Sequence, residues 1–145
     1  MINLATIEDI RDCSDKAREF YRDVMGKDEF HVEHFRNVMA SLIKNEMAIV
    51  LKRETNGAIR EAIGAVITPD CHTGKPTAMV SFWFVTGRYG LASGLVFMAF
   101  LGELRSRNVQ SVFVSASLGP RYERVRRFLE RTGFSPTDVY FRMNI

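Results

Sequence analysis

The chain has 145 residues, of which 46% are apolar and 26% are charged, and its formal net charge is +3. This composition is ordinary for a soluble globular protein with a substantial core, and no apolar run is long enough to span a bilayer. The N-terminal residues carry early acidic side chains and lack the apolar core of a signal peptide, so we expect a cytoplasmic protein. We expect one domain over residues 1–145, with Cys13 and Cys71 as reduced thiols because they lack metal-ligand spacing.

The first half of the chain predicts a strand, two helices and a β-hairpin. Thr6 and Asp9 resemble a capping box before a first helix, and a second apolar stripe at helical spacing follows it. Asn56 and Gly57 are typical of a type I′ turn between two strands. The elements expected in chain order are a strand over 1–5, helices over 7–24 and 29–43, and strands over 47–54 and 59–68.

The second half predicts alternating strands and helices. Residues 77–85 are apolar on both faces, as expected of a central strand that is covered on both sides. Residues 91–104 are apolar nearly all round, which predicts a deeply packed helix. The remaining elements expected are a loop over 69–76, a strand over 110–116, an amphipathic helix over 121–134 and a strand over 138–145.

The predicted order of elements is β-α-α-β-β-β-α-β-α-β, with room for one further short strand near Pro136. This order predicts an α/β fold with a central mixed sheet of about six or seven strands and helices on both faces. The β-α-β units in the second half require parallel neighbouring strands joined by right-handed crossovers.

Positive charge is concentrated in the second half. Residues 88–145 hold nine arginines against four acidic residues, a net charge of +5. Arginine suits phosphate recognition, so an anionic partner is expected: a nucleotide cofactor, a nucleic acid or an acidic protein face. Interleaved exposed aromatic residues suited to base stacking are absent, which disfavours nucleic acid. On the last helix, i,i+4 ion pairs are expected between Glu123 and Arg127 and between Arg126 and Glu130.

The element order, the break after residues 77–85 and the sequence FLERTGF at 128–134 resemble the GNAT superfamily of acyl-CoA-dependent N-acetyltransferases. More narrowly, the chain is similar to small GNAT-like proteins encoded by tailed phages, for which a virion-associated location stays open. The resemblance implies that the strands over 77–85 and 110–116 part and that the pantetheine arm of acetyl-CoA enters the gap. It also implies a pyrophosphate cradle at the start of the following helix. The expected cofactor-binding residues are Val85, Gly87, Arg88, Tyr89, Gly90, Leu91 and Ala92.

The chain departs from the family pattern at both usual catalytic positions. The place of the strand glutamate is filled by Val80 or Ser81, and the place of the last-helix tyrosine by Leu129. The cradle arginine, Arg88, is also one position late. Two functions therefore stay open: an N-acetyltransferase that transfers an acetyl group from acetyl-CoA to an unknown primary amine, or a catalytically degenerate scaffold or assembly protein, for example a phage structural component. The catalytic residues and the oligomeric state, including a homo-oligomer or a larger assembly, stay open too.

Four polar side chains are candidates to replace the missing groups. Tyr122 could donate a proton from the last helix, although its spacing also fits the core stripe of that helix. His72 could accept a proton near neutral pH, although a loop histidine is more often a solvated surface residue. Ser115 and Ser117 could hydrogen-bond a carbonyl or a cofactor amide, or they could form a turn.

Two further histidines, His31 and His34, lie three residues apart on a predicted helix. This spacing could suggest a metal pair, but no third ligand is placed to complete a metal site. A solvated helix face is the simpler interpretation, so we expect no metal.

Overall fold

The computed structural model describes residues 1–25, 29–86, 94–116, 121–138 and 140–145. These residues form two compact units, Met1–Val114 and Ser115–Ile145. None of the helices in these ranges combines the length and the apolar character needed to cross a bilayer.

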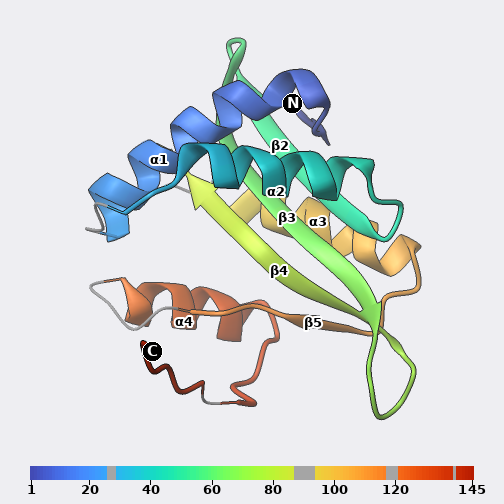
Figure 1. The fold of residues 1–145 in the computed structure, drawn as a ribbon. Coiled ribbons are helices and arrows are strands. Elements are labelled where there is room, and N and C mark those ends of the chain that lie inside the picture. The colour runs from blue at the N-terminus through green and yellow to red at the C-terminus, as the bar shows by residue number, and fades with distance from the viewer. Residues whose placement is uncertain (26–28, 87–93, 117–120, 139) are drawn as a thin grey trace. The chain divides into compact units, whose positions relative to one another are not determined.

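The first unit is built on a five-stranded sheet with the spatial order β1-β2-β3-β4-β5 (Figure 1). Its first four strands pair antiparallel with their neighbours, whereas β5 lies parallel to β4. The predicted mixed sheet is therefore present, with five strands in the described residues in place of the predicted six or seven. The strands are β1 Ile2–Leu4, β2 Ala48–Thr55, β3 Ala58–Pro69, β4 Pro76–Val85 and β5 Ser111–Phe113.

Helices cover both faces of this sheet, as predicted. Helices α1 (Ile10–Met25), which follows a 3₁₀ turn at Ile7–Asp9, and α2 (Val32–Lys44) lie on one face, and α3 (Leu95–Ser106) lies on the other (Figure 1). Strand β4 contacts helices on both faces, because successive side chains of a strand point to opposite faces of the sheet. The Phe82 ring centroid lies 5.0 Å from that of Phe35 on α2, and the adjacent Trp83 centroid lies 4.8 Å from that of Phe97 on α3.

Buried side chains fill the space on both sides of the sheet. The cluster between the sheet and helices α1 and α2 includes Cys13, Ala17, Met39, Leu42, Val50, Ile59, Ala62 and Phe84. On the other face, α3 buries its Val96, Phe97 and Phe100 side chains completely. The deeply packed helix predicted over 91–104 is thus present in its described part, although the Leu95 and Met98 side chains are about half exposed. A helix against one sheet face needs only one apolar stripe.

Two local predictions from the first half are confirmed. The Thr6 N–H donates a hydrogen bond to the Asp9 carboxylate at 2.7 Å, as in a capping box. Asn56 and Gly57 have φ angles of +52° and +73°, the left-handed conformation expected of the tight turn between β2 and β3.

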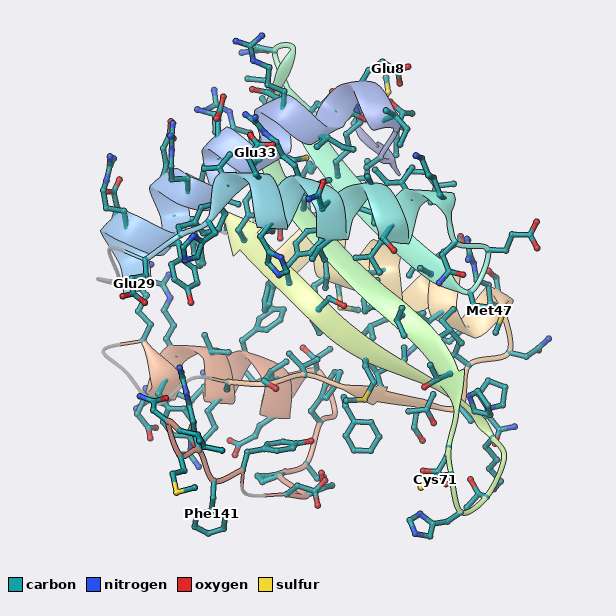
Figure 2. The ribbon with its side chains drawn as sticks, in the orientation of Figure 1. Glu8, Glu29, Glu33, Met47, Cys71 and Phe141 are labelled. Atoms are coloured by element: carbon teal, nitrogen blue, oxygen red, sulfur yellow. The ribbon has the colours of Figure 1, made fainter. Side chains whose placement is uncertain are left out.

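The second unit contains α4 (Tyr122–Arg131), and the strand predicted over 138–145 is not formed. Residues 134–138 and 140–145 have no regular structure, and the Phe141 side chain is 95% exposed and points outward (Figure 2). Apolar and polar side chains alternate in this segment, which favours a strand. A strand also needs a neighbouring strand to hydrogen-bond with its backbone. The described residues pair no strand with it, which is why the sequence pattern alone misleads here.

Ion pairs on α4 follow the predicted spacing only in part. Arg126 contacts Glu130 at 3.3 Å, as predicted, whereas Glu123 contacts Arg126 at 3.1 Å where the sequence predicts Arg127. Arg126 therefore bridges two acidic side chains on neighbouring turns. All three side chains are well exposed, so these pairs add little to stability.

Candidate functional site

Strands β4 and β5 pair at one end only. Their parallel ladder covers residues 77–79 of β4 and 111–113 of β5, and it ends at the pair Met79–Phe113. Strand β4 continues to Val85, and over that stretch β3 is its strand partner among the described residues. The ladder therefore stops short of the C-terminal half of β4, as the parting implied by the family resemblance requires, and β5 is shorter than the strand predicted over 110–116.

The parted half of β4 directs backbone groups toward the gap. The Thr86 N–H donates to the Arg60 carbonyl of β3 at 2.7 Å. Because successive residues of a strand direct their backbone groups to opposite edges, the N–H and C=O of Val85 face away from β3. The described residues place no strand on this edge beyond Met79, so these groups can hydrogen-bond an extended ligand that carries amides.

A β-bulge bends β4 beside the parting. The register places Gly64 of β3 opposite Phe82 and the next residue, Ala65, opposite Val80, so Ser81 is an extra residue of β4. Bulges interrupt the ladder and increase the local twist, and this one lies two residues beyond the last β4–β5 pair. Glycine at position 64 leaves room for the Phe82 ring, because a Cβ there would lie 2.8 Å from Phe82 Cζ and closer still to Cε1.

A fully buried carboxylate, that of Glu61, lies on the α3 face of the sheet beside the end of β4. Its oxygens accept hydrogen bonds from Arg53 Nε and from Trp83 Nε1, each at 3.2 Å. The backbone N–H of Val96, at the start of α3, acts to lower the pKa of this carboxylate. Glu61 thus connects β2, β3 and β4 through side-chain hydrogen bonds.

The environment of Glu61 changes its acidity. Burial raises the pKa of Glu61 to about 7, although the hydrogen bonds from Trp83 and Arg53 act against the rise. A group with this pKa changes its charge in the physiological range. Its full burial and the hydrogen bonds from Arg53 and Trp83 make it a link between strands and not a base that an external amine can reach.

Glu61 is absent from the predicted site residues. A weak signal for it exists in the sequence: it is the one acidic side chain in the run of residues 61–67, which is otherwise apolar, and that run follows a hairpin whose other strand carries Arg53. The pairing of these two residues depends on a bulge that the sequence does not reveal.

The sequence matches no protein-family model and no curated protein. Solved structures, in contrast, resemble all of it. A ribosomal-protein-alanine N-acetyltransferase from Brucella melitensis biovar Abortus 2308 gives a TM-score of 0.76 at 12% identity, covering 100% of this chain and 99% of its own. An aminoglycoside acetyltransferase from an uncultured soil metagenomic sample, in complex with sisomicin, gives 0.76 at 14% identity, covering 100% and 95%. A transcriptional regulator from Bacillus halodurans C-125 gives 0.81 at 14% identity, covering 100% and 99%.

The chain has the GNAT fold. The acetyltransferase structures that it resembles and the parting of β4 from β5 agree on this point, and the resemblance seen in the sequence is confirmed at the level of the fold. At these identities the likeness shows the fold alone. The narrower similarity to phage-encoded proteins stays a prediction.

The predicted cofactor-binding residues cover the last residue of β4 and the segment that follows it in the sequence. Val85 is the one that lies in the described part of the chain, at the end of the parted strand. The structure describes α3 from its N-cap, Gly94, onward. The cradle stays a prediction because its other residues lie outside the described ranges: Gly87, Arg88, Tyr89, Gly90, Leu91 and Ala92.

His72 lies away from the gap. The loop between β3 and β4 carries it at the N-terminal end of β4, where β4 is paired on both sides, and Figure 2 shows the neighbouring Cys71 beyond the ends of both strands. Its Nδ1 lies 3.0 Å from the exposed Cys71 thiol, and its backbone N–H donates to the Asp70 carboxylate at 3.0 Å. This arrangement supports the interpretation as a surface residue and is against a role as the catalytic base.

The other residues that the sequence suggests in place of the missing catalytic groups lie in the second unit. Tyr122 is a half-buried residue that starts α4, Ser115 is exposed, and Ser117 lies outside the described residues. Their roles near the gap stay predictions.

The histidine pair does not form part of a metal cluster in the described residues. His31 is the N-cap of α2. Both His31 and His34 are exposed. Within those ranges, no group of three or more histidine, cysteine, aspartate or glutamate side chains is placed to hold a metal ion.

Proposed function

We propose that this chain binds an acyl-CoA, with acetyl-CoA as the expected cofactor, in the gap where β4 and β5 part, and that it transfers the acyl group to a primary amine. The observation that carries the proposal is the end of the β4–β5 ladder at Met79–Phe113 in a chain with the GNAT fold. A pantetheine arm is extended and carries two amides, so it can add to the exposed edge of β4 as a further strand would. The backbone groups of Val85 face this edge and are the first that we assign to it.

The other end of the cofactor would meet the start of α3. Helix N-termini favour anions because their N–H groups lack intrahelical partners. The predicted cradle over Gly87–Ala92, with Arg88, would hold the pyrophosphate there. The net charge of +5 over residues 88–145 also favours an anionic ligand.

Acyl transfer would take place beside the bulge in β4. An extra residue in a bulge is left out of the regular ladder, so the backbone around Ser81 can offer an N–H to the thioester carbonyl. The attacking amine must lose its proton, and the described residues place no carboxylate on β4 to accept it. Tyr122 remains the candidate donor to the leaving thiolate, and water remains a path for the amine's proton.

The acceptor amine is the least defined part of the proposal. The neighbours named above are described as acting on ribosomal-protein alanine and on aminoglycosides, and both of these classes carry amines. The alternative of a scaffold without turnover rests on the missing glutamate and tyrosine, and the named neighbours include no assembly protein.

Thermal unfolding with and without acetyl-CoA tests the proposal. A ligand that binds the native state at about 100 times its Kd stabilises that state by about 2.7 kcal/mol, so we expect Tm to rise by several degrees. Release of the CoA thiol in the presence of a panel of amines then separates the two functions. A rise in Tm without thiol release would favour a cofactor-binding scaffold, and an unchanged Tm at millimolar acetyl-CoA would contradict cofactor binding altogether.

A further inference from the structure

A cavity of about 360 Å³ lies at the edge of the sheet where β1 ends beside β2. The pairing of these two strands stops where the Ala5 N–H donates to the Val50 carbonyl at 2.8 Å. Strand β2 begins earlier, at Ala48, and the turn that leads into it from α2 contains Met47, which Figure 2 labels. Because β1 does not reach Ala48, this part of the β2 edge is left to the cavity.

The buried part of the cavity lining is apolar. Leu42 of α2 and Ala48 and Val50 of β2 line it, and each is more than 90% buried. Leu4 lines it too and is 54% exposed, so an apolar ligand would remove this side chain from water. The volume falls within the range of small-molecule sites and has room for about twelve non-hydrogen atoms at roughly 30 Å³ each.

Two basic side chains line the same cavity, Lys44 at the end of α2 and Arg107 at the end of α3. The Arg107 guanidinium is held in place by two hydrogen bonds, from Nη1 to the Ala48 carbonyl and from Nε to Glu103, each at 3.0 Å. A guanidinium has more N–H donors than these two bonds use, and its planar fork suits a carboxylate. Arg107 is therefore oriented in advance for an anionic group beside the apolar lining.

The acidic side chains nearby leave this preference in place. Of the described residues that line the cavity, Glu46 is the acidic one, and it is exposed, as Lys44 is, so these two charges largely offset each other. Glu103 contacts Arg107 at Nε and does not line the cavity. The Asn45 side chain adds a neutral donor, since its Oδ1 accepts the Met47 N–H at 2.9 Å and its Nδ2 group can serve a ligand.

We propose that this cavity binds a small organic anion with an apolar body, of the class of medium-chain carboxylates. Arg107 holds the carboxylate, and the hydrocarbon chain lies against Leu4 and the buried apolar lining. The protein thus has a ligand site that is separate from the gap beside β4.

The position of the cavity makes this inference independent of acyl-CoA binding. Ala48, beside the cavity, pairs with Val66 of β3, whereas Val85, at the gap, pairs with Glu61. Val66 and Glu61 lie toward opposite ends of β3. A ligand at Arg107 therefore leaves the edge of β4 open.

A series of ligands with one chain and different head groups tests the chemistry. The full chain is titrated with octanoate, octanol and octylamine at neutral pH, and NMR follows the Val50 amide and the Arg107 Nε–H. We expect octanoate to bind about tenfold or more tightly than octanol, because a hydrogen bond to a charged group is worth at least that factor. Hexanoate should bind more weakly than octanoate, by up to about fourfold for each methylene that is buried.

Variants of the basic side chains identify the site. Arg107→Gln should weaken octanoate binding about tenfold or more and should leave octanol binding much less affected. It also removes a bond to the Ala48 carbonyl, so Lys44→Glu, at an exposed side chain, provides a second variant, which should weaken octanoate binding severalfold. Arg105→Gln and Arg105→Glu, at an exposed position of α3 outside the lining, are the matched controls and should bind as the wild type does.

Each outcome decides the inference. Octanoate binding that is weakened by Arg107→Gln and Lys44→Glu but not by the Arg105 variants supports it. Absence of octanoate binding at millimolar concentrations overturns it, as does octanol or octylamine that binds as tightly as octanoate. Octanoate that binds equally to the wild type and Arg107→Gln lies at another site, which overturns it as well. None of these results bears on acyl-CoA binding, so the proposed function stands or falls separately.

Discussion

Gly64→Ala should lower the free energy of unfolding by about 1–3 kcal/mol, because the new methyl group overpacks the β3–β4 contact. A Cβ at residue 64 would lie 2.8 Å from Phe82 Cζ, a separation that real Cβ atoms do not adopt. The Phe82 ring must then leave its place against Phe35 of α2, where the ring centroids are 5.0 Å apart. Denaturant unfolding at fixed pH measures the loss.

Two controls make this prediction specific. Gly102→Ala, within α3, places a Cβ where nothing lies within 4 Å, so it should stabilise the chain by up to about 1 kcal/mol through helix propensity. In a Phe82→Ala background the clash disappears, so Gly64→Ala should cost little there, and the double-mutant cycle should show coupling of about 1–3 kcal/mol. Additive costs in that cycle would mean that Phe82 is not the residue that requires glycine at position 64.

Glu61 should make the protein less stable as the pH rises from about 4.5 to about 7. The pKa of Glu61 is raised to about 7 in the folded state, whereas an unfolded glutamate titrates near 4.3. Between these values the folded protein binds more protons than the unfolded chain, so the free energy of unfolding falls with rising pH. The contribution amounts to about 3 kcal/mol, which is a large part of the stability of a domain of this size.

The measurement is denaturant unfolding from pH 5 to pH 8 for the wild type and Glu61→Gln. Gln has no charge to lose, so the difference between the two free energies should change by about 3 kcal/mol over this range, with the wild type losing stability relative to the variant. The lowered pKa values of Asp9 and Asp70 act below this window and cancel in the comparison. A difference that stays constant with pH would show that Glu61 is already ionised at pH 5.

Much of the first unit can be predicted from local sequence patterns. Residues 77–85 are apolar on both faces because Phe82 packs toward α2 while Trp83 packs toward α3, and that pattern indicates a central strand. The hairpin at Asn56 and Gly57 is equally local, because left-handed φ angles at these two residues suit the turn. The failures concern pairing over longer distances. Apolar and polar side chains alternate over residues 138–145, as in a strand. Strand propensity alone, however, does not provide a partner strand for backbone hydrogen bonds.

The candidate site depends on which residues of neighbouring strands lie opposite one another, and the sequence does not reveal this register. Without irregularities, the hairpin closed by Thr55 and Ala58 would place Arg53 opposite Arg60. The bulge in β3 moves Arg53 opposite Glu61 and creates the buried contact beside Trp83. The family pattern has its glutamate on β4. A comparison with that pattern therefore does not identify Glu61, whose carboxylate lies on β3 beside that strand.

Residue-resolved hydrogen exchange of the Val85 amide shows whether the edge of β4 is open to a ligand, because this N–H faces away from β3 and lies beyond the last β4–β5 pair. Without ligand, Val85 should exchange much faster than Thr86, whose N–H is bonded to the Arg60 carbonyl. With saturating acetyl-CoA, Val85 exchange should slow by at least about tenfold more than Thr86 exchange, because a pantetheine carbonyl covers the edge. A Val85 amide that is as protected as Thr86 in the free protein, or one that still exchanges rapidly when calorimetry shows acetyl-CoA bound, would contradict the account.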